Sequence, residues 1–255
     1  MACDVGQGDA FVLRAGPGAA VVVDAGPDPA AVDGCLTRLG VEDVPLMIAS
    51  HLHADHIGGL AGVLRGRRVG AIGLGPFAEP AAGRARVEQA AGAAGVPVAA
   101  LTVGQQYQLG DTRLRVLAPS TVFRGTRSDP NNNSLVLRAE VVGVSILLAG
   151  DVEQEAERAL LDSGEVLAAD VLKVPHHGSA QCERQFLDAV DPRVALVGVG
   201  ARNDYGHPNP GVLDHLRRGG ARVLRTDRDG DIAVLLDRHG LATAVAGRTA
   251  TSPAG

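Results

Sequence analysis

The stretch SHLHADHIGG, residues 50–59, places three histidines and an aspartate within six consecutive positions, directly after the apolar run VPLMIA. An apolar run of this length favours a buried strand, so the polar side chains follow a strand end. Imidazole nitrogens and carboxylate oxygens are ligands that suit zinc, manganese or iron. A polar loop or chance is the simpler explanation, but four ligand residues in the pattern HxHxDH favour a metal site.

The local geometry of the chain divides these ligands into two pairs. On an extended chain His51 and His53 point to the same side, so both can bind one ion. The turn that follows directs Asp55 and His56 toward a second ion beside the first. The pattern therefore predicts a site for two divalent ions.

Further candidate ligands follow later in the chain. A two-metal site needs a bridging carboxylate, and Asp151 ends the apolar run in ILLAGD. Asp151 is also suited to be the N-cap of the helix predicted over EQEAERALL, and both roles can hold. The segment VLKVPHHGS supplies His176 and His177, and NDYGHPNP places His207 in a loop. The histidines interpreted as surface residues are His215 and His239.

Composition limits the class of protein. The 255 residues suffice for one fairly large domain or two small ones. The formal net charge of −5 gives no overall indication of nucleic-acid binding, and the basic run RGRR (65–68) is more simply a solvated face. Aromatic residues are scarce, with four Phe, two Tyr and no Trp, so few side chains are available for stacking on bases.

The cysteines Cys3, Cys35 and Cys182 are odd in number and far apart, so we expect neither a zinc ribbon nor a disulfide framework. There is no signal peptide and no apolar run approaching about 18 residues, so we expect a soluble chain without direct membrane insertion. A strand begins within a few residues of Met1, which suggests a domain taken from a longer protein or a late gene start.

Short apolar runs that end in Gly, Asp or Pro predict an α/β domain over residues 1–241 and a disordered tail over 242–255. We expect two sheets packed face to face with helices outside. Strands are expected within 11–26, 44–50, 96–103, 112–119, 133–151, 169–175 and 194–200, with a hairpin over 222–237 that turns near Asp229-Gly230. Helices are expected over 56–66, 80–95, 153–164 and 211–220.

The series HxHxDH, then GD, then a strand ending in His resembles the motifs of metallo-β-lactamase-fold hydrolases. The segments DVGQGDA, VVVDAG, NNNSLVL, LLAGD, VPHHGS and YGHP resemble the hydrolase-like domain of ComEC competence-channel proteins, from about Asp4 to Leu236. The resemblance implies an αββα sandwich of two mixed β-sheets flanked by helices. It also implies attachment to a membrane channel that imports single-stranded DNA, where the domain is thought to degrade the strand that is not imported.

The resemblance implies roles for individual residues. His51 and His53 would hold the first metal, and Asp55 and His56 the second, with Asp151 as the bridge. In the pattern V-P-x-H-G the histidine at position 177 would ligate the second metal, and His176 is the alternative. The expected supporting residues are Asp24, which would buttress the ligand loop by hydrogen bonding, and Asp9 at the same rim.

Two departures from the family pattern matter. Many ComEC-like domains carry Asp where this chain has His53, and most of the superfamily has a third histidine for the first metal where this chain has DPNNNS. Asn131, Asn133 and Ser134 are weaker ligands or hydrogen-bond donors, so the first site is expected to be looser. The alternative is that these residues form a turn before a strand.

These features predict a hydrolase that uses two divalent ions, Zn or Mn, most simply a phosphodiesterase that cuts single-stranded DNA. Asp55 is expected to act as a ligand and in catalysis, and His207 and His176 are candidates to protonate the leaving oxygen or to bind the phosphate. We expect weak DNA binding and a place on the extracytoplasmic face beside the channel portion of a ComEC-like protein. The alternatives are hydrolysis of a phosphocholine ester, lactone or thioester, or a non-catalytic module that guides DNA.

Overall fold

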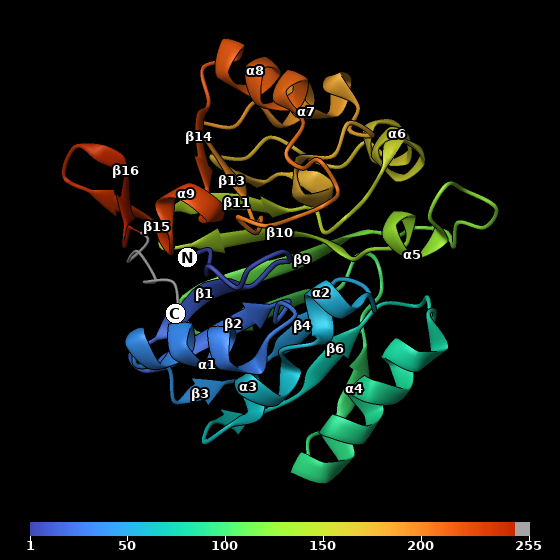
Figure 1. The fold of residues 1–255 in the computed structure, drawn as a ribbon, viewed down its shortest axis with the longest axis vertical. Coiled ribbons are helices and arrows are strands. Elements are labelled where there is room, and N and C mark those ends of the chain that lie inside the picture. Colours follow the sequence, from blue (N-terminus) through green and yellow to red (C-terminus); the bar gives the residue numbers. More distant parts are fainter. Residues whose placement is uncertain (248–255) are drawn as a thin grey trace, which may run out of the picture.

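Two β-sheets lie face to face, and helices cover the outer face of each (Figure 1). The computed structural model describes residues 1–247. Within that range the strands form two seven-stranded sheets and one two-stranded hairpin. This arrangement confirms the αββα sandwich expected from the sequence.

The first sheet comes from the N-terminal half. Its strands and helices are Phe11–Gly16 (β1), Ala19–Val23 (β2), Pro29–Arg38 (α1), Asp43–Val44 (β3), Met47–Ala49 (β4), Ala54–Ile57 (α2), Leu60–Leu64 (α3), Arg68–Val69 (β5), Ile72–Leu74 (β6), Ala81–Ala94 (α4) and Val98–Ala100 (β7). The strand order is β5-β3-β2-β4-β6-β7, with β1 antiparallel to β2 and the other pairs parallel.

The second sheet comes from the C-terminal half. Its elements are Gln106–Leu109 (β8), Thr112–Ala118 (β9), Asp129–Asn132 (α5), Val136–Val141 (β10), Val144–Leu148 (β11), Gln154–Asp162 (α6), Val171–Lys173 (β12), Pro175–Gly178 (η1), Arg184–Val190 (α7), Val194–Val197 (β13), Pro210–Arg218 (α8) and Arg222–Arg225 (β14). Strands β8 to β11 pair antiparallel, and β11 to β14 pair parallel, so this sheet is mixed as well.

The alternation of side chains along the strands explains the layers. In β2, Val21 and Val23 belong to the core between the two sheets, whereas Val22 packs in the core beneath the helices of the first sheet. In β10, Leu137 faces the central core and Val136 faces the helices of the second sheet. Because successive strand residues point to opposite faces, a strand segment buried on both sides needs apolar residues toward both cores, as Val21 to Val23 in β2 and Val136 and Leu137 in β10 provide.

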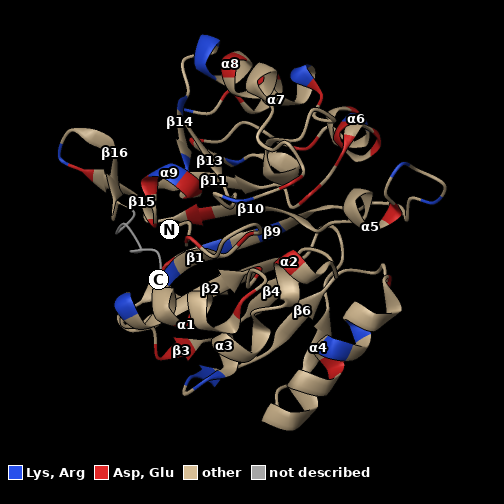
Figure 2. Cartoon of the chain, viewed as in Figure 1, with Lys and Arg blue, Asp and Glu red and all other residues tan. Residues whose placement is uncertain are grey.

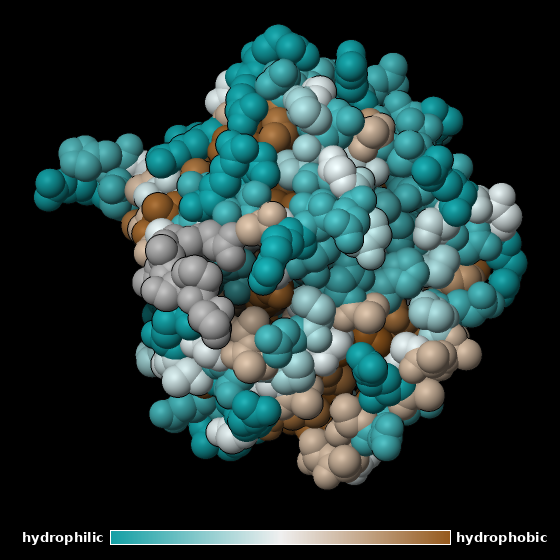
Figure 3. All heavy atoms as spheres, in the orientation of Figure 1, coloured by the Kyte–Doolittle hydropathy of each residue, from teal (hydrophilic) through white to brown (hydrophobic). Residues whose placement is uncertain are grey.

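The visible surface is mostly polar, as is expected for a fold that buries its apolar residues in a core. The face shown in Figure 3 is mostly hydrophilic, and hydrophobic residues come to it in scattered places. Within residues 1–247 no helix is both long enough and apolar enough to cross a membrane.

The structure corrects the prediction for the C-terminal strands. The expected hairpin over 222–237 is wrong: β14 pairs parallel with β13, and Thr226–Asp229 (α9) follows it as a helical turn. The carboxylate of Asp229 accepts a hydrogen bond from the backbone N–H of Arg225 at 2.7 Å, which closes that turn. The hairpin lies one strand later, between Ile232–Asp237 (β15) and Gly240–Val245 (β16), and it projects from the sandwich (Figure 1).

The predicted domain boundary is therefore also displaced. Since β16 extends to Val245, the tail expected from Ala242 onward does not begin there. The remainder of the predicted tail, 248–255, lies outside the described residues.

The cysteine prediction is wrong as well. Cys3 and Cys35 form a disulfide, with Cα atoms 6.0 Å apart, and both side chains are buried. A separation of 32 positions along the sequence gave no local signal for this pairing. The bond ties the segment before β1 to α1, and Cys182 is a buried free thiol.

Candidate metal centre

Most of the candidate ligands lie where strands of the two sheets end. Residues after β4 begin the HxHxDH stretch, Asp151 follows β11, and the two adjacent histidines follow β12 in η1. Loops at the carboxyl ends of parallel strands are the usual position for a site in a layered α/β fold. The site therefore joins the two halves of the sandwich.

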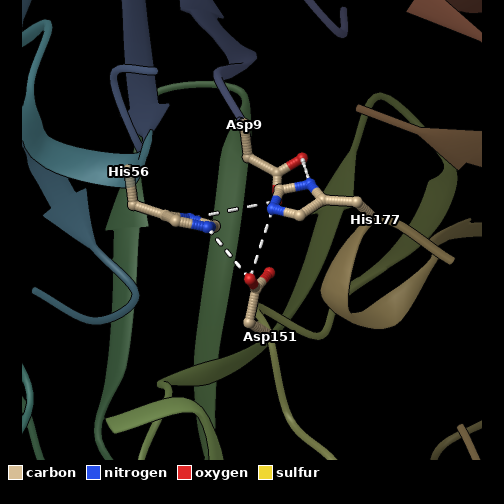
Figure 4. Close-up of side chains that lie close together, drawn as sticks. All are labelled: Asp9, His56, Asp151 and His177. Atoms are coloured by element: carbon tan, nitrogen blue, oxygen red, sulfur yellow. Dashed lines mark ion pairs between the residues drawn. The ribbon is translucent and has the colours of Figure 1, made fainter. Parts of the chain in front are cut away.

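Four buried side chains form the centre of this site: Asp9, His56, Asp151 and His177 (Figure 4). One potential ligand atom from each lies within 4.8 Å of all the others. The Nε2 atoms of His56 and His177 both lie 3.2 Å from Oδ2 of Asp151. The carboxylate that the sequence suggested as a bridge thus stands between two imidazoles, one from each half of the chain.

Asp55 completes this side of the site. Its Oδ2 lies 3.2 Å from Nε2 of His177 and 3.8 Å from Nε2 of His56. The residues predicted for the second metal therefore converge. The Nε2 atom of His56 is buried and accepts or donates no hydrogen bond within residues 1–247, although carboxylates face it. A buried imidazole nitrogen without a hydrogen bond, among carboxylates, fits a divalent ion of the zinc or manganese type.

Charge holds this centre together. Burial alone would lower the pKa of His56, but the carboxylates of Asp151, Asp24 and Asp55 outweigh it and raise that pKa well above its usual value. Burial would raise the pKa of Asp151, yet His177, His56 and Lys173 hold it well below the ordinary range. A cation bound among these groups would replace the histidine protons, because metal binding and protonation compete for the same nitrogens.

His51 and His53 lie side by side, as the extended-chain argument predicted. Nε2 of His51 is 2.9 Å from Nδ1 of His53, and the ring centroid of His51 is 4.2 Å from that of His56. Burial lowers the pKa of both His51 and His53, so both rings are neutral near pH 7, which is the state in which imidazole binds metal.

The Asn-rich loop is used mainly for structure. The Asn133 side chain donates to the backbone carbonyls of Phe123 and Asp129, each at 2.8 Å. Ser134 accepts a hydrogen bond from the backbone N–H of Asp151 at 3.2 Å. Asn131 lies closest to the site, donating to Glu153 at 3.3 Å.

Asp151 does not cap α6, contrary to one of the two roles considered for it. The N-cap position is Glu153, and the side-chain oxygen of Asn132 accepts from the backbone N–H groups of Glu153 and Ala156, each at 3.2 Å. The Asp151 carboxylate is therefore free to face the centre.

Asp24 supports the ligand loop in the way that was expected of it. One carboxylate oxygen accepts from the backbone N–H of Ser50 at 2.7 Å, and the other lies 2.8 Å from Nδ1 of His56. His177 is held similarly, with Nδ1 2.8 Å from the carbonyl oxygen of Gly198. Such contacts fix each imidazole so that Nε2 points into the site.

Backbone strain also marks the site. His176 and His177 have φ values of 44° and 52°, in the left-handed region that non-glycine residues seldom adopt. Strain of this kind persists where the surrounding structure enforces it, and it gathers at functional sites. The two histidines diverge: Nε2 of His176 is 4.0 Å from Asp151, while its Nδ1 lies 3.0 Å from Glu153. The geometry thus places His177, rather than His176, against Asp151.

Lys173 was not anticipated. Its ammonium group is buried and contacts Oδ2 of Asp9 at 2.6 Å, Oδ1 of Asp151 at 2.9 Å and the carbonyl of Gly150. Burial would lower the pKa of Lys173, but the two carboxylates raise it above the usual value. By engaging Oδ1 of Asp151, Lys173 leaves Oδ2 to face the two imidazoles. The one feature of the sequence that could have drawn attention to Lys173 is its rarity, since it is the one lysine among 24 Lys and Arg residues.

Asp9 was expected at the rim but lies inside the centre. Gly8 allows the loop before β1 to approach the ligand loop, because a Cβ atom there would lie 2.1 Å from the carbonyl oxygen of Asp55. The backbone N–H of Asp9 donates to that same carbonyl at 3.3 Å. Asp9 therefore links the N-terminal segment to Lys173.

His207 lies beside the centre rather than in it. Its ring centroid is 5.1 Å from that of His176 and 6.4 Å from that of His177. Burial lowers the pKa of His207 to about 4, so the ring is neutral near pH 7. These side chains line an open cavity of about 370 Å³ together with His53, Asp55, Asn131 and Asp151. The arrangement provides a solvent-accessible space next to the ligand atoms, with imidazole N–H groups on its wall.

Comparison with known proteins agrees with this geometry. The model of the metallo-beta-lactamase superfamily matches residues 3–200. ComE operon protein 3 of Bacillus subtilis (strain 168) is 36% identical over 200 residues, which make up 77% of this chain and 25% of that protein. Competence protein ComA of Neisseria gonorrhoeae is 30% identical over 208 residues, or 81% of this chain and 27% of that protein. This chain thus spans about a quarter of the length of these relatives.

The fold is similar to that of solved structures with little sequence identity. The zinc-bound structure of PqqB from Methylobacterium extorquens superposes with a TM-score of 0.56 at 11% identity, covering 86% of this chain and 85% of that one. At that identity the similarity supports the sandwich architecture alone.

Proposed function

Because this chain belongs to the metallo-beta-lactamase superfamily, we propose that it is a metal-dependent phosphodiesterase and that its substrate is single-stranded DNA. The observation that carries the proposal is the convergence of Asp9, His56, Asp151 and His177 within 4.8 Å, beside an open cavity. The competence names of its relatives favour DNA as the substrate.

The ligand set has room for two ions. His51, His53 and Asp151 would hold the first, while Asp55, His56, Asp151 and His177 would hold the second. Divalent ions at such a site activate water and neutralise charge on a phosphoryl group. Carboxylates and imidazoles suit both zinc and manganese. Since Asn131, Asn133 and Ser134 replace the usual third histidine, the first ion is expected to be held less tightly.

The remaining residues orient the proposed ligands or face the cavity. Asp24 and the carbonyl of Gly198 orient the imidazoles, and Lys173 fixes the rotamer of Asp151. His176 and His207 present their rings to the cavity, where their N–H groups can donate to a phosphoryl oxygen or to the departing oxygen. Asp55, beside His177, is more exposed than the buried carboxylates of Asp9 and Asp151, so it is the one that an entering substrate would meet first.

The cellular setting is part of the proposal. We infer that the chain acts beside the channel portion of a ComEC-like protein at the extracytoplasmic face. The disulfide supports this, because such bonds persist in oxidising compartments. With a net charge of −5 and charges of both signs dispersed over the elements (Figure 2), the isolated domain is expected to bind DNA weakly.

A second candidate is hydrolysis of a small ester such as a phosphocholine ester, lactone or thioester. The cavity of about 370 Å³ favours it, because that volume suits a small molecule. A non-catalytic module that guides DNA is a third possibility, and it would bind metal without turnover.

One experiment separates these functions. The purified chain, loaded with Mn²⁺ or Zn²⁺, is incubated with end-labelled single-stranded DNA, a phosphocholine ester and a lactone, with His51→Ala and Asp55→Ala as controls. We expect slow, sequence-independent cleavage of DNA that is abolished by chelator and in both variants. Brisk hydrolysis of the small ester with intact DNA would establish the second candidate, and metal binding with no turnover would establish the third.

A further inference from the structure

Tyr205 is an aromatic side chain that nothing in the fold or in the metal centre uses. Its exposed fraction is 73%, the largest among the exposed large hydrophobic residues found within 1–247. It lies in the loop after β13, two residues before His207. The two rings are nearly parallel, with an interplanar angle of 29° and centroids 6.0 Å apart. An aromatic face is thus displayed to solvent directly beside the catalytic cavity.

The loop that carries Tyr205 is tied down. The side-chain amide of Asn203 donates to the carbonyl oxygens of Gly200 at 2.9 Å and His207 at 3.1 Å. Its oxygen accepts from the backbone N–H of His207 at 3.2 Å. Since these bonds bracket Tyr205, its ring is presented on a preorganised loop, which lowers the entropy cost of binding.

Tyr205 stands between two hollows. One is the catalytic cavity, and the other, of about 380 Å³, is lined by Arg127, Gln181 and Asn209, among others. Tyr205, His176 and His207 line both. A chain of nucleotides whose phosphate lies at the metal centre would therefore extend past the ring of Tyr205 into the second hollow.

Arg127 supplies a cation on the wall of that second hollow. It is exposed and makes no hydrogen bond or ion pair within residues 1–247. The loop that leads into α5 carries basic residues, as Figure 2 shows. A guanidinium group with no protein partner is available to a phosphate, which it binds well.

We propose that the second hollow is a nucleotide subsite: the unpaired base next to the cleaved phosphate stacks on Tyr205, and the following phosphate binds Arg127. This inference rests on the proposed nuclease function, and it adds the physical basis on which the enzyme would select single strands over duplexes. In a duplex the base faces are already stacked, so Tyr205 can select for single strands without reading sequence, since every base has an aromatic face. A single stacking platform also agrees with weak binding overall.

The test uses tyrosine fluorescence, because the chain has no Trp and only two Tyr. In a Tyr107→Phe variant, Tyr205 is the sole emitter. This protein, held in chelator at low salt, is titrated with an oligothymidylate and with an abasic strand of equal length. We expect quenching with the oligothymidylate and none with the abasic strand.

Dissociation constants for the two strands then show whether the quenching comes from stacking on Tyr205. Tyr205→Ala should raise Kd for oligothymidylate about 5- to 150-fold, the range that stacking on one aromatic ring supplies, and leave Kd for the abasic strand unchanged. Tyr205→Phe should behave like the wild type. Arg127→Ala should weaken both strands alike. Equal losses for both strands on Tyr205→Ala, or no loss for either, would overturn the subsite.

Cleavage distinguishes failure of this inference from failure of the proposed function. With Mn²⁺ the wild type should cut both the abasic strand and the oligothymidylate, and Tyr205→Ala should raise KM for the oligothymidylate more than KM for the abasic strand. If that strand and the oligothymidylate both stay intact with the wild type, the nuclease function fails. If both are cut and Tyr205→Ala cuts them with unchanged rates and KM, the function stands and the subsite fails.

Discussion

Replacing both cysteines of the disulfide, as Cys3→Ala/Cys35→Ala, should destabilise the protein by about 3.7 kcal/mol. This value follows from the loop-closure entropy of a cross-link spanning 32 positions, at 25 °C. The bond restricts the unfolded chain, so its loss is expected in the free energy of unfolding rather than in the native contacts.

The assay is urea unfolding of the metal-free protein, oxidised and reduced, with the variant alongside. Cys182→Ala is the matched control, because it removes a buried sulfur that is not cross-linked. Reduction should lower the midpoint of wild type and of Cys182→Ala, and it should leave the double variant unchanged. If the double variant loses less than about 1 kcal/mol, or if reduction acts equally on all three proteins, the reasoning is refuted.

The other predictions concern single buried groups. Lys173→Met should cost the metal-free protein about 3–5 kcal/mol in urea unfolding by leaving two buried carboxylates without their cation. Arg113→Met, which removes the exposed ion pair with Glu140, should cost less than about 1 kcal/mol, and equal costs would contradict this reasoning. His207→Ala should keep both ions by metal analysis and lose about 100-fold or more in turnover; loss of metal would make His207 a ligand. Burial raises the pKa of Glu157 to about 8, so the folded state keeps a proton that the unfolded state releases above its ordinary pKa of 4.5. Stability should therefore fall between about pH 4.5 and 8, and Glu157→Gln should flatten that decline in unfolding curves measured at intervals of pH; a variant that declines like the wild type would count against it.

The sequence was sufficient for the parts of the site in which local spacing controls geometry. HxHxDH after a buried strand places His51 beside His53 whatever the remainder of the chain does, because side-chain direction on an extended segment has a period of two. The apolar runs likewise predicted strands of both sheets, since strand segments that are buried on both faces are mostly apolar.

The remainder depended on contacts between distant segments. The segment around Lys173 has the apolar sequence of a core strand, which gives no indication of a buried ion pair. Only the packing of the two halves of the chain places Asp9 opposite Lys173. The bond between Cys3 and Cys35 has no local pattern for the same reason. The C-terminal hairpin was displaced because β14 pairs with the distant strand β13, and the expected turn is the helical turn α9, in which the backbone N–H of Arg225 donates to the carboxylate of Asp229.

The central claim is that two ions joined by Asp151 support phosphodiester hydrolysis. The most direct measurement is the rate of single-stranded DNA cleavage as Mn²⁺ is added in known equivalents to metal-free protein, for the wild type and for Asp151→Asn. We predict that wild-type activity rises to a plateau at two equivalents, while Asp151→Asn binds fewer ions, stays folded and remains inactive. A plateau at one equivalent, or an Asp151→Asn protein that binds two ions and cleaves DNA at the wild-type rate, would contradict the claim.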